Sequence, residues 1–358
     1  IARRLNLPRE DSLRLEFLVR RHLDMAHISQ RRDLNDIRLI QDFANTMMMA
    51  ENLKMLFLLT FADIKAVGPD VWSEWKGHLL QELFEKTYET FERGNFMSEV
   101  RSERVRNRKS KVLDALKNDF GEKQVKDHLR SMSLRYLLTH RSWEITDHVA
   151  LELSRGDETV AMKVTHDVDA EYSNVTISTL DVPGLFSMIT GVLAANGINI
   201  LGAQIYTRSN GFALDILQVN KPVGGIIDDP VKWQKVQSDL TSVLEGRVRV
   251  SSLVKKRQKV SFLPGQKMPR FPNRVEFDCD VSREHTVIDI FAHDEVGLLY
   301  RITRTLAELG LYIYVAKIST KVDQITDTFY VKDIFGQTIS DAAKREEIRK
   351  ALLECMTE

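Results

Sequence analysis

Two short loops in this 358-residue chain carry an acidic residue and, three positions later, a glycine. They read Asp181-Val-Pro-Gly-Leu185 and Asp294-Glu-Val-Gly-Leu298, and each joins a predicted strand to a predicted helix. The aspartate can cap free N–H groups of the helix, and the glycine lets another group approach the backbone closely. Because helix N-termini attract anions, each loop predicts either a site for a free carboxylate or a capped helix without a ligand. The candidate ligand-binding residues are Asp181, Gly184 and Leu185 in the first loop and Asp294, Gly297 and Leu298 in the second.

The two loops belong to a unit that occurs twice in the chain. They lie 113 residues apart, and the same offset aligns Ala203 with Ala316. A deletion of one residue in the hairpin that follows brings Asp215 opposite Asp327. Tight turns tolerate such changes in length. Repetition of the acidic loop at a fixed offset favours ligand binding over a merely capped helix.

Hydrophobic periodicity predicts the same order of elements in both units, namely strand, helix, strand, strand and helix. A fourth strand at 247–250 would close the first copy and give the ferredoxin-like arrangement of an α+β protein. We expect 274–280 to supply the missing strand of the second copy and 158–164 to add a strand to the first. The predicted elements are 174–180, 183–196, 198–207, 211–220 and about 229–244 in the first copy, and 285–292, 296–309, 311–320, 324–333 and 341–355 in the second.

The repeated unit resembles the ACT domain, a small βαββαβ module that binds amino acids at the interface between two copies. Some ACT domains only assemble subunits, so a docking module without a ligand is the alternative. The resemblance covers about half of the chain. The matching residues are Asp181, Gly184, Leu185, Gly197 and Ala203 in the first copy, and Asp294, Gly297, Leu298, Gly310 and Ala316 in the second.

The first third of the chain is predicted to be helical, with a break at Asn35-Asp36, because apolar residues recur at steps of three and four. Its segments 17–25, 30–36, 58–66 and 71–76 resemble the end of the metal-dependent HD phosphohydrolase domain in bifunctional uridylyltransferase/uridylyl-removing enzymes of nitrogen regulation. Stringent-response (p)ppGpp synthetase/hydrolases also join HD and ACT domains. They fit less well, since 95–157 is too short and too helical for the domains that they carry in between.

The resemblance to the uridylylating enzymes implies a function for each part. A nucleotidyltransferase domain would attach UMP from UTP to the PII signal protein when glutamine is low. The HD domain would remove it with Mg²⁺ or Mn²⁺ when glutamine is high, and the ACT pair would sense glutamine. Asp63 would be the last metal ligand of the HD set and His22 a contact to phosphate or metal, both in catalytic roles. The alternatives are an Asp63 carboxylate paired with Arg31 or Arg32 and a His22 without function.

Neither a Gly-Ser motif with paired acidic residues nor a His-Asp doublet before Asp63 occurs in the sequence. We therefore expect this chain alone to lack both enzymatic activities. The expected segments are the end of an HD domain at 1–94, a helical tether at 95–157, the first ACT domain at 158–254, a linker at 255–273 and the second ACT domain at 274–358.

Composition excludes several other classes of protein. With 51 Lys and Arg against 51 Asp and Glu, the chain has no net charge, which argues against a nucleic-acid partner. No apolar run approaches the length of about 20 residues that crosses a bilayer, so no membrane segment is expected. The two cysteines, Cys279 and Cys355, form no disulfide framework, which is typical of a cytoplasmic protein.

Overall fold

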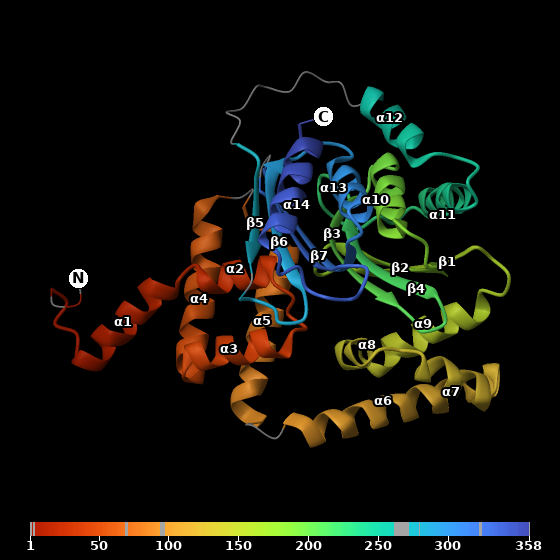
Figure 1. Cartoon of the computed structure of the whole chain (residues 1–358). Coiled ribbons are helices and arrows are strands. Elements are labelled where there is room, and N and C mark those ends of the chain that lie inside the picture. The colour runs from red at the N-terminus through yellow and green to blue at the C-terminus, as the bar shows by residue number, and fades with distance from the viewer. Residues whose placement is uncertain are drawn as a thin grey trace. The chain divides into compact units, whose positions relative to one another are not determined.

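In the computed structural model, the described residues are 2, 4–68, 71–93, 97–260, 272–278, 280–321 and 324–357. The chain divides into two compact units, residues 1–96 and 97–358. The described part of the first unit is helical, as predicted, and Asp36 caps α3 at the expected break by accepting the N–H of Arg38 at 2.9 Å. Its core contains the fully buried Met25, Leu53 and Leu83. The helices are α1 (Arg9–Arg21), α2 (Asp24–Arg31), α3 (Ile37–Met47), α4 (Ala50–Val67) and α5 (Glu74–Arg93), all labelled in Figure 1.

The described part of the second unit is built on one antiparallel sheet of eight strands. The strands lie in the order β1-β2-β4-β3-β7-β8-β6-β5, so the two repeats contribute four neighbouring strands each. The predicted α+β class is confirmed. The strands are β1 (Val160–Asp167), β2 (Tyr172–Leu180), β3 (Asn199–Thr207), β4 (Phe212–Asn220), β5 (Arg274–Asp278), β6 (Thr286–His293), β7 (Tyr312–Lys321) and β8 (Gln324–Lys332).

A pseudo-twofold axis relates the two repeats. Where β3 pairs with β7, Ala203 lies opposite Ala316. On the helical layer, the hydroxyls of Thr190 in α10 and Thr303 in α13 lie 3.0 Å apart in a hydrogen bond. Both pairs consist of residues at the 113-residue offset of the repeat, as expected for an axis that passes between them. The same axis therefore relates the two acidic loops.

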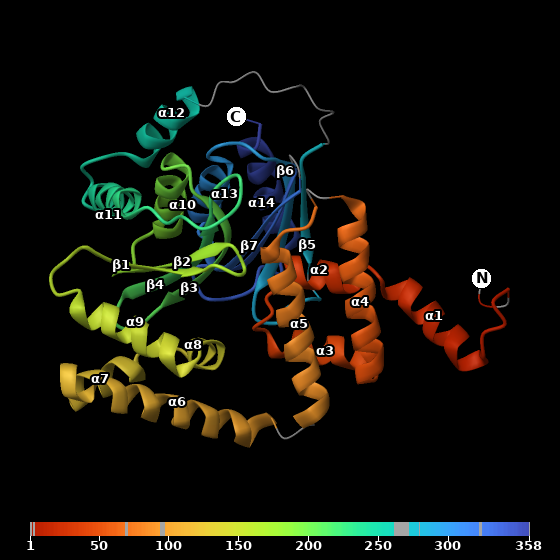
Figure 2. The ribbon, with the colours of Figure 1, turned by 180° about the vertical axis from the view of Figure 1, so that it is seen from behind.

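Helices cover the sheet on both faces (Figures 1 and 2). On one face a single core runs through both repeats and includes Ile189, Leu217, Ile302 and Phe329. That face carries α10 (Leu185–Ala195), α11 (Pro230–Leu244), α13 (Leu298–Glu308) and α14 (Ala342–Cys355). The other face of the first repeat carries α8 and α9, with α6 and α7 packed beneath them.

The helices over this second face come from the segment expected to be a tether. They are α6 (Met97–Phe120), α7 (Glu122–Arg130), α8 (Leu134–Thr139) and α9 (Ser142–Ser154). The segment is helical, and it shares a buried cluster with Tyr206, Leu214 and Ile216 of the sheet. Within that layer Glu152 lies 2.7 Å from Nε2 of His128 and also pairs with Arg208. The helices therefore belong to the core of the second unit.

The structure corrects the prediction of a fourth strand at 247–250. These residues lead into the helix α12 (Val250–Val260). Strand β2 pairs with β1 on one side and with β4 on the other, so no edge remains there for a further strand. Val250 and Val254, one helical turn apart, are both buried. The expected linker therefore begins as a helix, while 261–271 lies outside the described residues.

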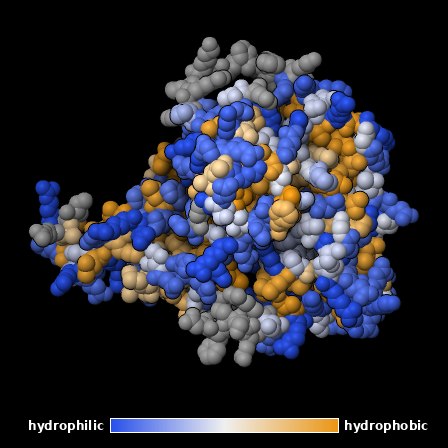
Figure 3. Space-filling model, in the orientation of Figure 1, coloured by the Kyte–Doolittle hydropathy of each residue, from blue (hydrophilic) through white to orange (hydrophobic). Residues whose placement is uncertain are grey.

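The two strands predicted upstream of the repeats are confirmed as β1 and β5, which pair with β2 and β6. Cys279, at the end of the predicted 274–280 strand, lies outside the described residues. Each repeat consequently runs strand, strand, helix, strand, strand, helix instead of ending with its last strand. Among the described residues, no helix is both long and apolar enough to span a bilayer. Figure 3 shows hydrophilic side chains over the outward face of α14, where Glu346, Glu347 and Lys350 are exposed.

Candidate functional site

The first corner, residues 181–185, joins β2 to α10. Gly184 precedes the helix with φ +76°, a left-handed conformation that glycine adopts without strain. Asp181 does not cap the helix, and its Oδ2 instead accepts the hydroxyl of Thr207 on β3 at 2.9 Å. The predicted aspartate cap is therefore wrong, because Gly184 occupies the capping position.

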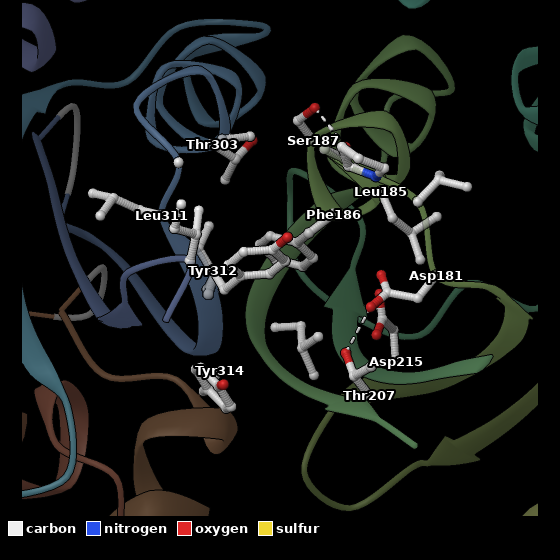
Figure 4. Close-up of a pocket in the computed structure, with 18 residues that line it drawn as sticks. Asp181, Leu185, Phe186, Ser187, Thr207, Asp215, Thr303, Leu311, Tyr312 and Tyr314 are labelled. Atoms are coloured by element: carbon white, nitrogen blue, oxygen red, sulfur yellow. Dashed lines mark hydrogen bonds between the residues drawn. The ribbon is translucent and has the colours of Figure 1, made fainter. Parts of the chain in front are cut away.

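A cavity of about 250 Å³ lies at the first corner, between the two repeats. In Figure 4, Asp181, Asp215 and Thr207 lie on the side of the first repeat, and Tyr312 and Thr303 lie on the side of the second. The volume is at the small end of ligand pockets, which suits a molecule of a few heavy atoms. Besides Asp181, Asp215 and Thr207, the lining includes Gly184 and Leu185 of the corner, Phe186 and Ser187 of α10, Ile205 of β3, and Thr303, Ala307, Leu311, Tyr312, Ile313 and Tyr314 of the second repeat.

Two backbone amides at the start of α10 are candidate donors to an anion at this corner. The N–H of Leu185, one of the predicted contacts, donates to the carbonyl of Val182 at 3.0 Å. Among the described residues, no backbone acceptor is recorded for the amides of Phe186 and Ser187. Since the first N–H groups of a helix lack partners within the helix, these two amides are the better donors to a ligand carboxylate.

Asp215 is a cavity residue to which the sequence alone assigned no role. It lies on β4 in the row of side chains that faces the core, between Ala213 and Leu217, and is only 1% exposed. Within the described part of the chain, neither of its carboxylate oxygens has a hydrogen-bond partner. Burial, and then the nearby charge of Asp181, raises the pKa of Asp215 well above its usual value.

The second corner, residues 294–298, is covered by α12. The side-chain amide of Gln258 donates to the carbonyl of Val296 at 2.9 Å. A Cβ built on Gly297 would lie 2.7 Å from Cγ1 of Val254, whereas a Cβ on Gly184 would meet its nearest atoms at 3.5 and 3.8 Å. The first corner is thus open and the second is closed by the chain's own side chains.

The pseudo-twofold axis shows what α12 covers. Gly310 lines the cavity at the first corner, and its equivalent in the first repeat is Gly197. A Cβ on Gly197 would lie 2.7 Å from a guanidinium nitrogen of Arg257 in α12. Helix α12 therefore occupies the place that corresponds to the cavity.

The second corner otherwise repeats the first. Gly297 precedes α13 with φ +89°, no side chain caps the helix, and Leu298 donates its N–H to Glu295 at 3.0 Å. Asp294 is exposed. Asp327, the equivalent of Asp215, is 1% exposed, and burial followed by the charge of Asp294 raises its pKa well above the usual value. The alignment of Asp215 with Asp327 is confirmed by their matching places opposite Ile205 and Ile318.

The predicted metal site in the first unit gains no support from the described residues. Asp63 is exposed on α4, because it lies off the apolar face that buries Leu56 and Ile64. Nδ1 of His22 lies 2.8 Å from the carbonyl of Val19 in its own helix. No group of three His, Cys, Asp or Glu side chains suited to a metal occurs in the part that the structure describes. Asp63 would supply one ligand of such a site, so its role toward Mg²⁺ or Mn²⁺ stays a prediction.

The predicted residues of the first corner line the cavity. Thr207, Asp215 and the cover formed by Val254 and Gln258 were not predicted from the sequence. A signal for Asp215 was present, since an aspartate recurs at the equivalent place in two otherwise apolar strands. Burial of a carboxylate without a partner is costly, so its repetition is informative. The cover could not be predicted in this way, because Val254 and Gln258 lie in a basic segment that is typical of a linker.

The chain is similar to known proteins along nearly its whole length. Residues 274–358 match the family model described as an ACR9-like, ACT-like domain. The chain is 36% identical over 357 residues to the bifunctional uridylyltransferase/uridylyl-removing enzyme of Rhodospirillum rubrum. It is 34% identical over 358 residues to the enzyme of the same name from Azospirillum brasilense. The resemblance inferred from the sequence is confirmed.

Each alignment covers 99% of this chain but 38% of the relative. The chain therefore spans less than half the length of these uridylyltransferase/uridylyl-removing enzymes. The similarity extends through both structural units, and the ACT-like match falls on the second repeat.

Proposed function

We propose that residues 97–358 form the amino-acid-sensing region of a uridylyltransferase/uridylyl-removing enzyme, and that glutamine binds in the cavity at the first corner. The observation that supports this most directly is the open cavity between two twofold-related ACT-like repeats, where the amides of Phe186 and Ser187 have no backbone acceptor among the described residues. The ligand carboxylate would accept from these amides. The whole enzyme would act on the PII protein with UTP and release UMP, with a divalent metal that the described residues do not hold.

A sensor must bind its ligand weakly enough to respond to changing concentration. For a metabolite near millimolar concentration, a binding free energy of about −4 kcal/mol is sufficient. The ligand must also favour one arrangement of the protein over another, because equal affinity for both shifts nothing.

Strand β3 offers a direct link between ligand and helical layer. Ile205 and Thr207 line the cavity, whereas Tyr206 between them faces α8 and α9. The Tyr206 hydroxyl lies 3.2 Å from Nε2 of His140 and 2.5 Å from the amide oxygen of Gln204. A ligand that shifts β3 would therefore move the packing of helices 97–154, which join the repeats to the first unit.

Isothermal titration of this chain with each of the twenty amino acids tests the proposal. Glutamine is expected to bind the wild-type chain and to lose its affinity in Gly184→Val, because the added side chain fills the cavity. Gly246→Val is the matched control, since Gly246 has a similar φ of +73° and nothing within 4 Å of its Cβ position. Absence of glutamine binding by a folded wild-type chain would overturn the proposal, as would equal binding by Gly184→Val.

A docking module without a ligand is the second candidate, and the closed second corner favours it. There α12 joins the two repeats where a ligand would otherwise lie. If docking is the whole function, none of the twenty amino acids will change the thermal stability of the chain.

A further inference from the structure

The buried carboxylate of Asp215 requires an explanation that a carboxylate-binding corner does not supply. Asp215 lines the cavity, both of its oxygens lack a partner among the described residues, and Asp181 stands beside it (Figure 4). A buried acidic group without a partner is destabilising unless it is neutral or meets a cation. Two carboxyl groups on one wall would repel an anion at that end of the cavity.

The surroundings favour an organic cation over a metal ion. Divalent metals in proteins take four or more ligands, usually several of them carboxylate or carbonyl oxygens. Within the described residues, no group of three His, Cys, Asp or Glu side chains forms such a site. The lining of the cavity also contains the apolar residues Leu185, Ile205 and Ile313, which suit the carbon chain of a small molecule.

We propose that Asp215 and Asp181 form a cation subsite that receives the primary ammonium group of the ligand and thereby restricts the cavity to amino acids. The subsite deepens the proposed function and rests on it. The ligand carboxylate would lie toward the amides of Phe186 and Ser187, and its ammonium toward the two aspartates. Asp215 would be the residue that determines this specificity, since Asp181 already accepts a hydrogen bond from Thr207.

The test compares glutamine with 4-carbamoylbutanoate, which is glutamine without its ammonium group. The wild-type chain is expected to bind glutamine about tenfold to hundredfold more tightly than the analogue, as for a charge-assisted hydrogen bond. Asp215→Asn should weaken glutamine binding by a similar factor and leave the affinity for the analogue unchanged. Asp181→Asn is a second variant that removes a less buried carboxylate and should weaken glutamine binding in the same direction.

Asp327→Asn is the matched control, because Asp327 occupies the same strand position beneath the covered second corner. It is expected to leave glutamine binding unchanged. Circular dichroism and thermal unfolding of every variant establish that the fold is intact. The cation subsite is refuted if wild type and Asp215→Asn bind glutamine equally, if wild type does not discriminate against the analogue, or if Asp327→Asn causes the same loss.

The two proposals fail in different ways. If glutamine does not bind but another amino acid does, and Asp215→Asn weakens it, the cation subsite stands and the choice of glutamine is wrong. If no amino acid binds to the folded chain, both proposals fall.

Discussion

Adding one methyl group at each corner distinguishes the open corner from the covered one. Gly184 and Gly297 occupy equivalent positions with φ +76° and +89°, so alanine is strained by a similar amount at both. Their surroundings differ. The new Cβ would lie 3.5 Å from its nearest neighbour at Gly184, an ordinary contact, and 2.7 Å from Cγ1 of Val254 at Gly297.

The left-handed backbone conformation costs about 1–2 kcal/mol for alanine in either variant. At Gly297 the clash adds about 1–3 kcal/mol, the usual cost of overpacking, because Val254 is stiff and only 5% exposed. Gly297→Ala should therefore lower the free energy of unfolding by about 2–5 kcal/mol and Gly184→Ala by about 1–2 kcal/mol.

Denaturant unfolding of both variants, followed by circular dichroism, measures this difference. The double variant Val254→Ala/Gly297→Ala provides the internal check, since removal of the clashing methyl groups should make the two changes less destabilising together than their sum. Equal destabilisation by the two glycine variants, or strict additivity in the double variant, would refute the proposed cover by α12.

Three further predictions concern His148, Arg208 and the cover formed by α12. Burial and nearby His140 lower the pKa of His148 from 6.5 to about 3, so the folded state keeps it neutral and loses stability as pH falls below about 6.5. Replacing His148 with Gln should reduce the loss at pH 5 by about 2 kcal/mol in urea unfolding, and an unchanged loss would contradict this. Arg208→Met should cost about 3–5 kcal/mol by removing the arginine that pairs with buried Glu152, while His128 stays beside that carboxylate. Arg208→Met/Glu152→Gln should recover part of this loss, and a mild effect would exclude a buried pair. Val254→Ala/Gln258→Ala should uncover the second corner, so that calorimetry finds a second glutamine bound per chain. An unchanged stoichiometry would contradict this prediction.

The order of elements in the repeats could be predicted because the same sequence pattern occurs in two copies, and each copy supports the assignment made for the other. Each predicted helix and central strand of the two copies is present, with ends that differ by a few residues. In the first copy, strands were predicted at both 158–164 and 247–250, and the structure has a strand at the first segment and the start of a helix at the second. The pairing of the strands explains this difference. Strand β1 takes the free side of β2, and the spacing of Val250 and Val254 then favours a helix.

The location of the candidate site was predictable, but its chemistry was predictable only in part. The loop pattern identifies Gly184 and Asp181, yet it cannot tell a capping carboxylate from one that faces a cavity. That difference depends on Thr207, which the hairpin of β3 and β4 brings to Asp181 from 26 positions along the chain. Closure of the second corner depends on Val254 and Gln258, whose contacts are likewise formed only in three dimensions.

The fusion of both repeats into one polypeptide has a further effect. Two identical subunits about a true dyad would each present the same corner, and any mutation that closed one would close both. Here the two halves are encoded separately, so Gln258 can cover Val296 at the second corner while the first corner stays open. Covalent linkage thus permits the two corners to diverge, whereas the identical subunits of a homodimer would change together.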